Sequence, residues 1–220
     1  MENYTGTIGK NNVSVVLGDM TQIACDAYIV PQFDNCASYG GVGGAVARAG
    51  GKEGLDIYNA LASKKPLRFG QVVLTKSGGG RSKQLLHVVS VGSSDDLEFA
   101  TVHNAFYAAL MSAQGHKINT IVAPAMGTGI IGNLTAEQSA KSMMSAIDRI
   151  GNNESPLSIS LAIYGDECTF NTFVSVLEKQ FYRGATPEKG KKQFNLEEWL
   201  INMQNDLTKN ARAFGDENIG

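Results

Sequence analysis

The sequence predicts an α/β layered fold in which crossover connections join the strands. Six short apolar runs rich in Val and Ile are expected to be strands, and near-continuous runs of this kind are typical of strands covered on both faces. Helical patterns lie between several of these runs, and such alternation favours crossover connections. Hydrophobic residues make up 43% and charged residues 18% of the 220 residues, which suits one large domain with a proper core.

The first expected strand is closed by Gly18 and Asp19. The second, which begins at Ala27, is expected to stop at Pro31. In chain order the expected strands are 13–17, 27–30, 71–75, 85–91, 120–123 and 158–163.

Three helices are expected from apolar residues spaced three and four apart. The first covers 102–113 and is followed by Gly115 as a C′ residue. The second, 135–150, begins with a capping-box spacing and meets Gly151. The third carries its apolar stripe over 170–181.

The domain is expected to occupy residues 1–183. Residues 184–220 are expected to form a polar linker, one C-terminal helix over 195–207 and a frayed tail. Trp199 would lie on the apolar face of that helix.

Composition excludes several classes of protein. Nineteen basic and twenty-one acidic residues give a net charge of −2, which argues against binding of nucleic acid by bulk electrostatics. The sequence has no apolar stretch long enough to span a membrane and no secretory pattern at its start. Three scattered cysteines suit a reducing cytosol, so a cytoplasmic location is expected, with no metal and no cofactor.

Four glycines within five residues form the first informative segment. Gly40, Gly41, Gly43 and Gly44 precede a short helical pattern. Glycine lets the backbone approach a ligand closely, and the free N–H groups of the following helix point at the same place. The segment therefore predicts a phosphate site that needs no Lys or Arg, although a flexible turn is the alternative.

A second glycine-rich segment, 124–132, lies between an expected strand and an expected helix. Loops that leave the carboxyl ends of parallel strands line the ligand crevice of open α/β sheets. Two amide-lined loops facing each other would suit a diphosphate, whereas the alternative is two unrelated turns.

Asp19 follows the first expected strand, at the expected edge of this crevice. A carboxylate there accepts a hydrogen bond from an exocyclic amine such as that of adenine. Taken alone, Asp19 is better explained as a residue that caps its own turn.

Four segments in this order resemble the macrodomain family over about residues 10–182. They read Gly-Asp-Met-Thr at 18–21, Asp-Ala-Tyr-Ile-Val at 26–30, Gly-Gly-Val-Gly-Gly-Ala-Val at 40–46 and Gly-Thr-Gly-Ile-Ile-Gly at 127–132. The resemblance implies a three-layer α/β/α sandwich with a mixed, largely parallel six-stranded sheet. It also implies binding of ADP-ribose.

The resemblance assigns residues to each part of that ligand. Asp19 and the Met20 backbone would hold the adenine, and either Tyr164 or Phe170 would stack on it. The first loop would wrap the diphosphate and distal ribose with Gly41, Val42, Gly43 and Gly44. The second would close the other side with Ala125, Gly127, Thr128, Gly129, Ile130 and Ile131.

The departures from the family concern catalysis. Hydrolytic members carry Asn-Ala-Ala-Asn where this chain has Val-Pro-Gln-Phe at 30–33, and an Asp where it has Gly43. That hydrolase chemistry therefore cannot be carried over, and whether the chain is an enzyme stays open. Asp34 and Asn35 are weak catalytic candidates that would substitute only if the loop curls inward.

The remaining reactive residue types favour structural interpretations. His87 is expected to be a satisfied structural histidine, and His103 is expected to be solvated at a helix start. Cys36 lies in the crevice loop, where a small buried filler is favoured over a reactive thiol.

The favoured function is a module that binds ADP-ribose, a related ADP-ribosyl metabolite or an ADP-ribosylated protein. The alternative is a mono-ADP-ribosyl hydrolase or ADP-ribose-1″-phosphate phosphatase that uses a shifted or substrate-assisted water. A third hypothesis is an interaction module built on the C-terminal helix. No membrane or nucleic-acid partner is expected, and the oligomeric state is open.

Overall fold

The computed structural model describes residues 2–33, 40–63, 66–91, 99–129, 134–151 and 155–181. All of them lie in the first of the two units into which the chain divides, Met1–Gly184. The second unit, Ala185–Gly220, lies outside the described residues, as do the predicted linker, C-terminal helix and tail. The domain boundary at residue 183 therefore stays a prediction.

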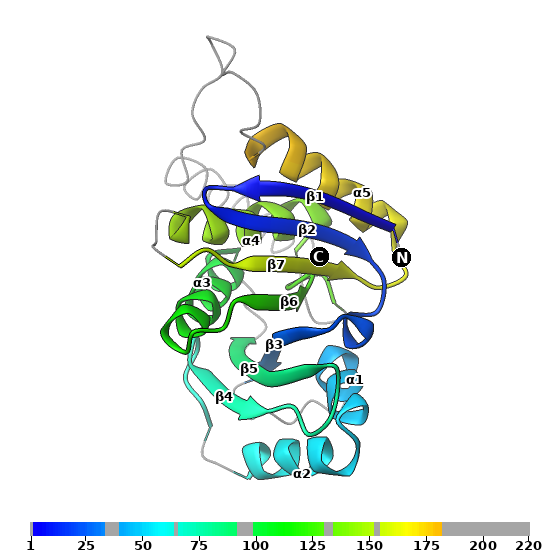
Figure 1. The fold of residues 1–220 in the computed structure, drawn as a ribbon, viewed down its shortest axis with the longest axis vertical. Coiled ribbons are helices and arrows are strands. Elements are labelled where there is room, and N and C mark those ends of the chain that lie inside the picture. Colours follow the sequence, from blue (N-terminus) through cyan, green and yellow to red (C-terminus); the bar gives the residue numbers. More distant parts are fainter. Residues whose placement is uncertain are drawn as a thin grey trace, which may run out of the picture. The chain divides into compact units, whose positions relative to one another are not determined.

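The described residues form a seven-stranded sheet with helices on both faces (Figure 1). Its strand order is β1-β2-β7-β6-β3-β5-β4, in which the inner five strands run parallel and the two edge strands run antiparallel to their neighbours. The predicted layered α/β fold and the mixed, largely parallel sheet are confirmed. The strands are β1 (Glu2–Ile8), β2 (Asn11–Leu17), β3 (Cys25–Phe33), β4 (Val72–Lys76), β5 (Ser82–Val91), β6 (Thr120–Pro124) and β7 (Ser158–Ile163).

The predicted number of six strands is wrong, because β1 is a seventh. It pairs with β2 over its whole length, from Glu2 opposite Leu17 to Ile8 opposite Asn11. Most of its side chains are exposed or half-buried, and only Ile8 is buried. An edge strand of this kind carries no apolar run, so the pattern that identified the inner strands is missing.

Pro31 does not end the second expected strand. β3 continues through it to Phe33, with Pro31 opposite Val88 of β5. On its other side β3 pairs with β6 at Ala27 and Tyr28. Pro31 lies beyond that pairing, so its missing N–H interrupts no described ladder bond on the β6 side.

Two groups of helices cover the sheet. One comprises α1 (Gly41–Ala49) and α2 (Gly51–Ala62), and the other comprises α3 (Phe99–Gly115), α4 (Ala136–Ile150) and α5 (Glu167–Val176) (Figure 1). A 3₁₀ turn, η1 (Met20–Gln22), follows β2, and a π-helical turn, η2 (Leu177–Phe181), continues α5. No helix in the described part of the chain is long and apolar enough to cross a membrane.

The helix ends agree with the sequence in α4 and differ in α3. Thr135 and Gln138 form the predicted capping box, and Gly151 is the C-cap. Gly115 is not the predicted C′ residue, because α3 includes it and the left-handed φ of +57° falls at Lys117. Helix α2 has no counterpart among the expected helices, since it is rich in glycine and polar residues and buries only a few side chains.

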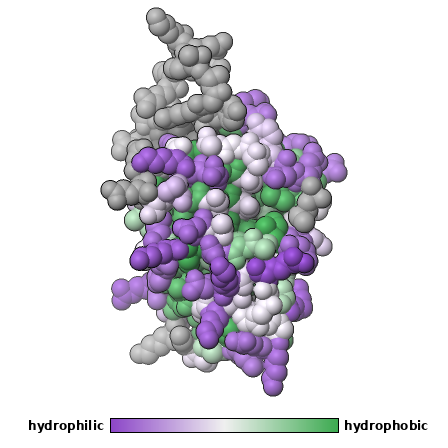
Figure 2. All heavy atoms as spheres, viewed as in Figure 1, coloured by the Kyte–Doolittle hydropathy of each residue, from purple (hydrophilic) through white to green (hydrophobic). Residues whose placement is uncertain are grey.

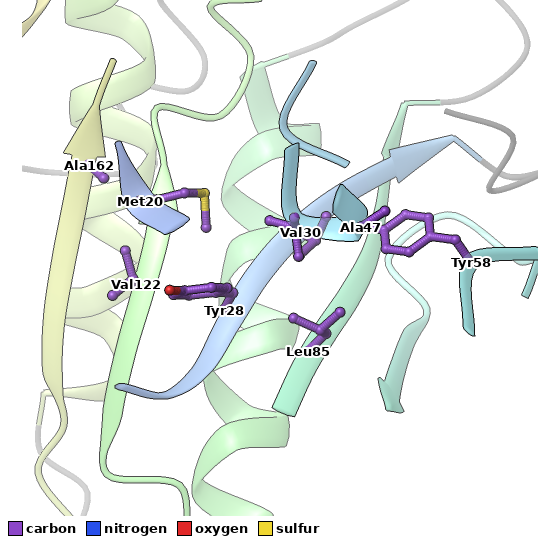
Figure 3. Packing of buried hydrophobic residues seen from close by; sticks show 9 residues of the cluster. Met20, Tyr28, Val30, Ala47, Tyr58, Leu85, Val122 and Ala162 are labelled. Carbon is purple, nitrogen blue, oxygen red and sulfur yellow. The ribbon is translucent and has the colours of Figure 1, made fainter. Parts of the chain in front are cut away.

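The core beside the candidate site joins the central strands to η1 and α1 (Figure 3). Met20 from η1 packs in one cluster with Tyr28 of β3 and Val46 of α1. The Tyr28 hydroxyl donates to the backbone oxygen of Ile23 at 2.8 Å, which fixes the segment after β2 to the sheet.

The surface is mixed rather than divided into large patches on the face that Figure 2 shows, where hydrophilic and hydrophobic side chains are interspersed. Among the described large hydrophobic side chains, Tyr164 is the most exposed, at 81%. Scattered apolar side chains of this kind need no special explanation, except where they lie beside a ligand site.

Candidate ligand-binding site

The candidate site lies at the carboxyl edge of the sheet, where the parallel strands end. β6 is followed by α4 and then by β7 on one side, whereas β3 is followed by α1 and α2 and then by strands on the other side. Neighbouring strands whose connections leave in opposite directions form a crevice at their carboxyl ends. Among the described residues, β3 pairs with β6 at Ala27 and Tyr28 only, although both strands run further toward this edge.

The first glycine-rich segment is a helix start rather than a loop. Gly40 is the N-cap, and Gly41, Val42, Gly43 and Gly44 form the first turn of α1. The N–H of Gly44 donates to the Gly40 oxygen at 3.0 Å, so the three N–H groups before it have no intrahelical acceptor. These three amides and the helix dipole make the start of α1 favourable for an anion.

The first two glycines of this segment border open space, whereas the last two are buried. A Cβ at Gly40 or Gly41 would meet no atom within 4 Å, whereas Gly43 and Gly44 are buried. The predicted site residues did not include Gly40. Its position just before a helical pattern could have indicated it, because glycine is an acceptable N-cap residue.

The second glycine-rich segment begins as a tight turn after β6. The Thr128 hydroxyl donates to the Ala125 oxygen at 3.0 Å, and the Leu134 N–H donates to the Gly127 oxygen at 3.2 Å. A Cβ at Gly127 would stand 2.8 Å from Leu134 Cδ1 and 3.0 Å from Val102 Cγ2, which are side-chain ends that can shift, whereas the φ of +85° favours glycine there. Gly129 is exposed and open, and the predicted Ile130 and Ile131 lie outside the described residues.

Asp19 caps its own turn, which is the structural alternative considered for it. Its Oδ1 accepts from the N–H and from the hydroxyl of Thr21, both at 2.8 Å. Both of these bonds use Oδ1, and the carboxylate is half-buried. Met20 is buried at 6% exposure, and its side chain packs in the hydrophobic core. The roles of both residues toward adenine stay predictions.

The two aromatic candidates differ in exposure. Tyr164 follows β7 directly at the carboxyl edge and is 81% exposed. Phe170 is only 3% exposed, within α5. A base could stack on Phe170 only if the ring left the core, so Tyr164 is the candidate that the structure leaves available.

The positions that carry catalytic side chains in hydrolytic members are not suited to that chemistry here. Val30 is fully buried in the core, Phe33 is half-buried at the end of β3, and Gly43 is a buried glycine. Asp34 and Asn35 lie outside the described residues, so their candidacy stays a prediction. Cys36 lies outside them too.

His87 is a structural histidine, as predicted. It is fully buried on β5, with Nδ1 3.2 Å from Gln32 Nε2 and Nε2 2.9 Å from the Thr75 hydroxyl. The same Gln32 amide donates to the Tyr58 hydroxyl at 3.1 Å, which ties α2 to the sheet. Burial lowers the pKa of His87 to about 4, so its imidazole is neutral at pH 7.

The prediction that His103 is solvated is wrong. The side chain is 3% exposed because α3 packs on α4, and Nδ1 lies 3.2 Å from the Ser142 oxygen. Its ring stacks with Tyr107, and the Arg149 guanidinium lies 4.3 Å from the centre of the Tyr107 ring. Burial lowers the pKa of His103, which favours the neutral form of this interior residue.

Comparisons with known proteins agree with this architecture. The profile of the Macro domain family matches residues 34–143, half of the chain. An uncharacterized protein of Thermoplasma volcanium is 30% identical over 76% of this chain and 90% of its own length. The O-acetyl-ADP-ribose deacetylase of Salmonella gallinarum is 25% identical over 77% of this chain and 96% of its own length.

Solved macrodomains share the fold at lower sequence identity. A mutant of the Oceanobacillus iheyensis macrodomain with ADPR is 20% identical, with a TM-score of 0.70 over 80% of this chain and 97% of that one. The Trypanosoma brucei macrodomain in complex with ADP-ribose is 17% identical, with a TM-score of 0.65 over 75% of this chain and 68% of that one. With its matching profile, its relatives and its layered sheet, this chain belongs to the Macro domain family.

Proposed function

We propose that this chain binds ADP-ribose at the carboxyl edge of the sheet. The observation that carries the proposal is the start of α1, where three consecutive backbone amides precede the first intrahelical hydrogen bond. Such a group of donors suits a diphosphate, and open space lies in front of it at Gly40 and Gly41. Membership of the Macro domain family and the ADP-ribose complexes of structural neighbours support the same ligand.

The rest of the ligand would extend along the same edge in both directions. The diphosphate would lie on the amides of Gly41, Val42 and Gly43, with Gly44 beneath them. The segment Ala125–Gly129, continued by Ile130 and Ile131, would cover the other side of the diphosphate and the distal ribose. At the opposite end, Asp19 Oδ2 would accept from the adenine amine, beside the Met20 backbone, and Tyr164 would stack on the base.

Calorimetry with ADP-ribose tests the proposal directly. We expect a micromolar dissociation constant, roughly −8 kcal/mol, accompanied by a rise in melting temperature. Absence of both heat and thermal shift at millimolar ADP-ribose would contradict the proposal. A parallel titration with a mono-ADP-ribosylated protein shows whether the linked form is accepted at the same site.

The sharpest variant is Gly40→Glu, compared with Gly40→Gln. Both side chains enter open space, so neither should disturb packing. The carboxylate lies before the amides of α1 and repels the diphosphate, while it complements the helix dipole. Gly40→Glu should therefore weaken ADP-ribose binding far more than Gly40→Gln, without lowering the melting temperature. Equal affinities for the two variants would show that the diphosphate lies elsewhere.

Deacetylation of O-acetyl-ADP-ribose is a second candidate function. It is favoured by relatives that bear the name O-acetyl-ADP-ribose deacetylase and align over 77% of this chain. Hydrolysis needs an activated water, and Val30, Phe33 and Gly43 supply no group that holds one. Binding is therefore the primary proposal, and activity would depend on Asp34, Asn35 or on water held by the ligand and backbone amides.

A further inference from the structure

An open surface depression of about 520 Å³, called here the amino-edge cavity, lies at the amino edge of the sheet, at the end opposite to the candidate ADP-ribose site. Its walls include the starts of β3 and β5, the end of β4 and the turn between α3 and β6. The volume falls within the range of small-molecule pockets. Its charged and titratable lining residues are Asp26, Glu53, Lys76, Lys83, His116 and Lys117.

Both carboxylate oxygens of Asp26 accept hydrogen bonds from groups of the protein. One carboxylate oxygen accepts from Lys83 Nζ at 2.7 Å. The other accepts from the Thr120 hydroxyl at 2.9 Å, the Thr120 N–H at 3.0 Å and the Asn119 N–H at 3.3 Å. Asp26 is therefore a structural carboxylate that joins the starts of three strands, and it does not neutralise the other cations of the cavity.

Two of the lysines lack such a partner. Neither Lys76 nor Lys117 forms an ion pair within the described part of the chain, and both are exposed. Without counting His116, three lysines and two carboxylates give the lining a net charge of +1, whereas the whole chain has −2. The lining thus has a small positive excess in a protein whose total charge is negative.

Both walls that carry these lysines are held in place. On one wall, the hairpin after Lys76 packs so closely on α2 that a Cβ at Gly78 would overlap the Gly54 backbone. On the other wall, Lys117 adopts a left-handed φ of +57° after α3, and the neighbouring His116 Nδ1 donates to the Ser112 oxygen at 2.8 Å. The helix dipole favours a cation at Lys117, and the bond to Asp26 accounts for the position of Lys83, but neither interaction accounts for Lys76.

We propose that this amino-edge cavity is a second anion site that takes a compact phosphate-bearing small molecule, recognised by Lys76, Lys83 and Lys117. Lysine binds phosphate oxygens as a point charge, and Lys83 keeps further N–H donors beyond the one given to Asp26. A di- or triphosphate carries enough charge to meet three ammonium groups that approach from different walls.

The test uses inorganic pyrophosphate and the full chain carrying Gly40→Glu, in which the amides at the start of α1 are blocked. Calorimetry at about 50 mM salt, where screening is modest, should show pyrophosphate binding. Adding Lys76→Gln and Lys117→Asn should raise the dissociation constant at least about tenfold, since each removes a charge-assisted contact. Asn is chosen at 117 because it tolerates the left-handed backbone.

A matched control removes the same charge elsewhere. Lys10→Gln with Lys179→Gln alters two exposed lysines outside the cavity, and should change the dissociation constant much less. Equal losses in the two double variants would overturn the proposal, because net charge alone would then explain binding. It would also be overturned by absence of heat at millimolar pyrophosphate, or by binding of a single-stranded oligonucleotide without binding of pyrophosphate.

ADP-ribose binding separates this inference from the proposed function. The Lys76→Gln, Lys117→Asn variant with Gly40 intact should retain the ADP-ribose affinity of the unmodified protein. If pyrophosphate bound the unmodified protein but not Gly40→Glu, the anion would belong to α1, and the amino-edge proposal would be wrong.

Discussion

The two edges of the sheet present different kinds of hydrogen-bonding group. At the amino edge, the Asp26 carboxylate is occupied by the protein, and ammonium groups of lysines remain. At the carboxyl edge, backbone amides remain at the start of α1, and the Asp19 carboxylate uses Oδ1 for its own turn. The comparison teaches that the Asp26 carboxylate joins three strands with both of its oxygens, whereas the bonds described for the Asp19 carboxylate involve one oxygen and stay within its own turn.

The largest expected effect concerns the packing of the amino edge. Gly78→Ala should lower the free energy of unfolding by roughly 2–4 kcal/mol, because its φ is +82° and the new Cβ overlaps the Gly54 backbone. Urea denaturation measures the change. Gly80→Ala is the control in the same hairpin, since its Cβ has its nearest contact at 3.7 Å. Similar stabilities for the two variants would show that the hairpin shifts freely away from α2.

At the carboxyl edge, Asp19→Ala should weaken ADP-ribose binding by about tenfold or more. A hydrogen bond to a charged acceptor contributes roughly 1.5–3 kcal/mol, and this one selects for adenine. Titration of Asp19→Ala with ADP-ribose and with its inosine analogue separates recognition of adenine from a general effect on the turn. If Asp19 recognises adenine, only the affinity for ADP-ribose should fall. Thr21→Val removes one Asp19 contact without removing the carboxylate and controls for the turn. An unchanged dissociation constant in Asp19→Ala would leave Asp19 as a turn residue only.

Asp26→Asn should cost about 1–2 kcal/mol of stability without changing ADP-ribose affinity. The side chain is 25% exposed, so solvent screening reduces the contribution of Lys83, and the bonds to Thr120 and Asn119 carry most of the effect. If the Asn side-chain nitrogen faced the N–H groups of Thr120 and Asn119, two hydrogen-bond donors would face each other and neither would have an acceptor. Loss of ligand affinity at unchanged stability would contradict the division of roles between the edges.

The pH dependence of Asp26→Asn sharpens this prediction. The Lys83 ammonium holds the pKa of Asp26 at about 2, below its ordinary value, so its stabilisation is present above about pH 4. It is lost as pH falls toward 2, and the difference in melting temperature between the two proteins should shrink over that range. His87 lowers the stability of both proteins as pH falls from about 6.5 to 4, and therefore cancels in the difference.

The sequence was sufficient to predict the inner strands. It was insufficient for elements whose polar residues or glycines give no strand or helix pattern. Continuous apolar runs identify strands buried on both faces, but β1 is an edge strand whose exposed side chains give no such run. Glycine has low helix propensity, so Gly41–Gly44 reads as a loop, although the structure makes it the first turn of α1. His103 is polar by type, yet packing of α3 on α4 buries it.

The candidate sites were predictable to different degrees for a related reason. Backbone donors at the carboxyl edge follow from glycines that are adjacent in the sequence, so a local pattern indicates them. Lys76, Lys83 and Lys117 come from separate elements and lie among other solvated charges in the sequence. Only the strand order brings their walls together, which is why no local pattern indicated the amino-edge cavity.

The smallest expected effect is catalytic. The chain should release ADP-ribose from mono-ADP-ribosylated Asp/Glu protein, or acetate from O-acetyl-ADP-ribose, weakly or not at all. Side chains that orient the ribose or polarise water are replaced by Val30, Phe33 and Gly43, and general acid–base help is typically worth about 10²–10⁴-fold. The assay compares this chain with an active macrodomain at equal, ligand-saturated concentration, so that weak binding is not mistaken for weak chemistry.

Robust turnover would contradict this comparison of the two edges, because the carboxyl edge would then activate a water in addition to offering backbone amides to a ligand. Asp34→Ala and Asn35→Ala locate the source of such turnover. Loss of activity in either variant, with ADP-ribose affinity retained, would mean that a side chain displaced along the segment after β3 activates the water. Activity retained in both would leave water held between the ligand and the amides of Gly41, Val42 and Gly43. Gly40→Gln would then reduce turnover only as far as it reduces binding, since it removes no amide.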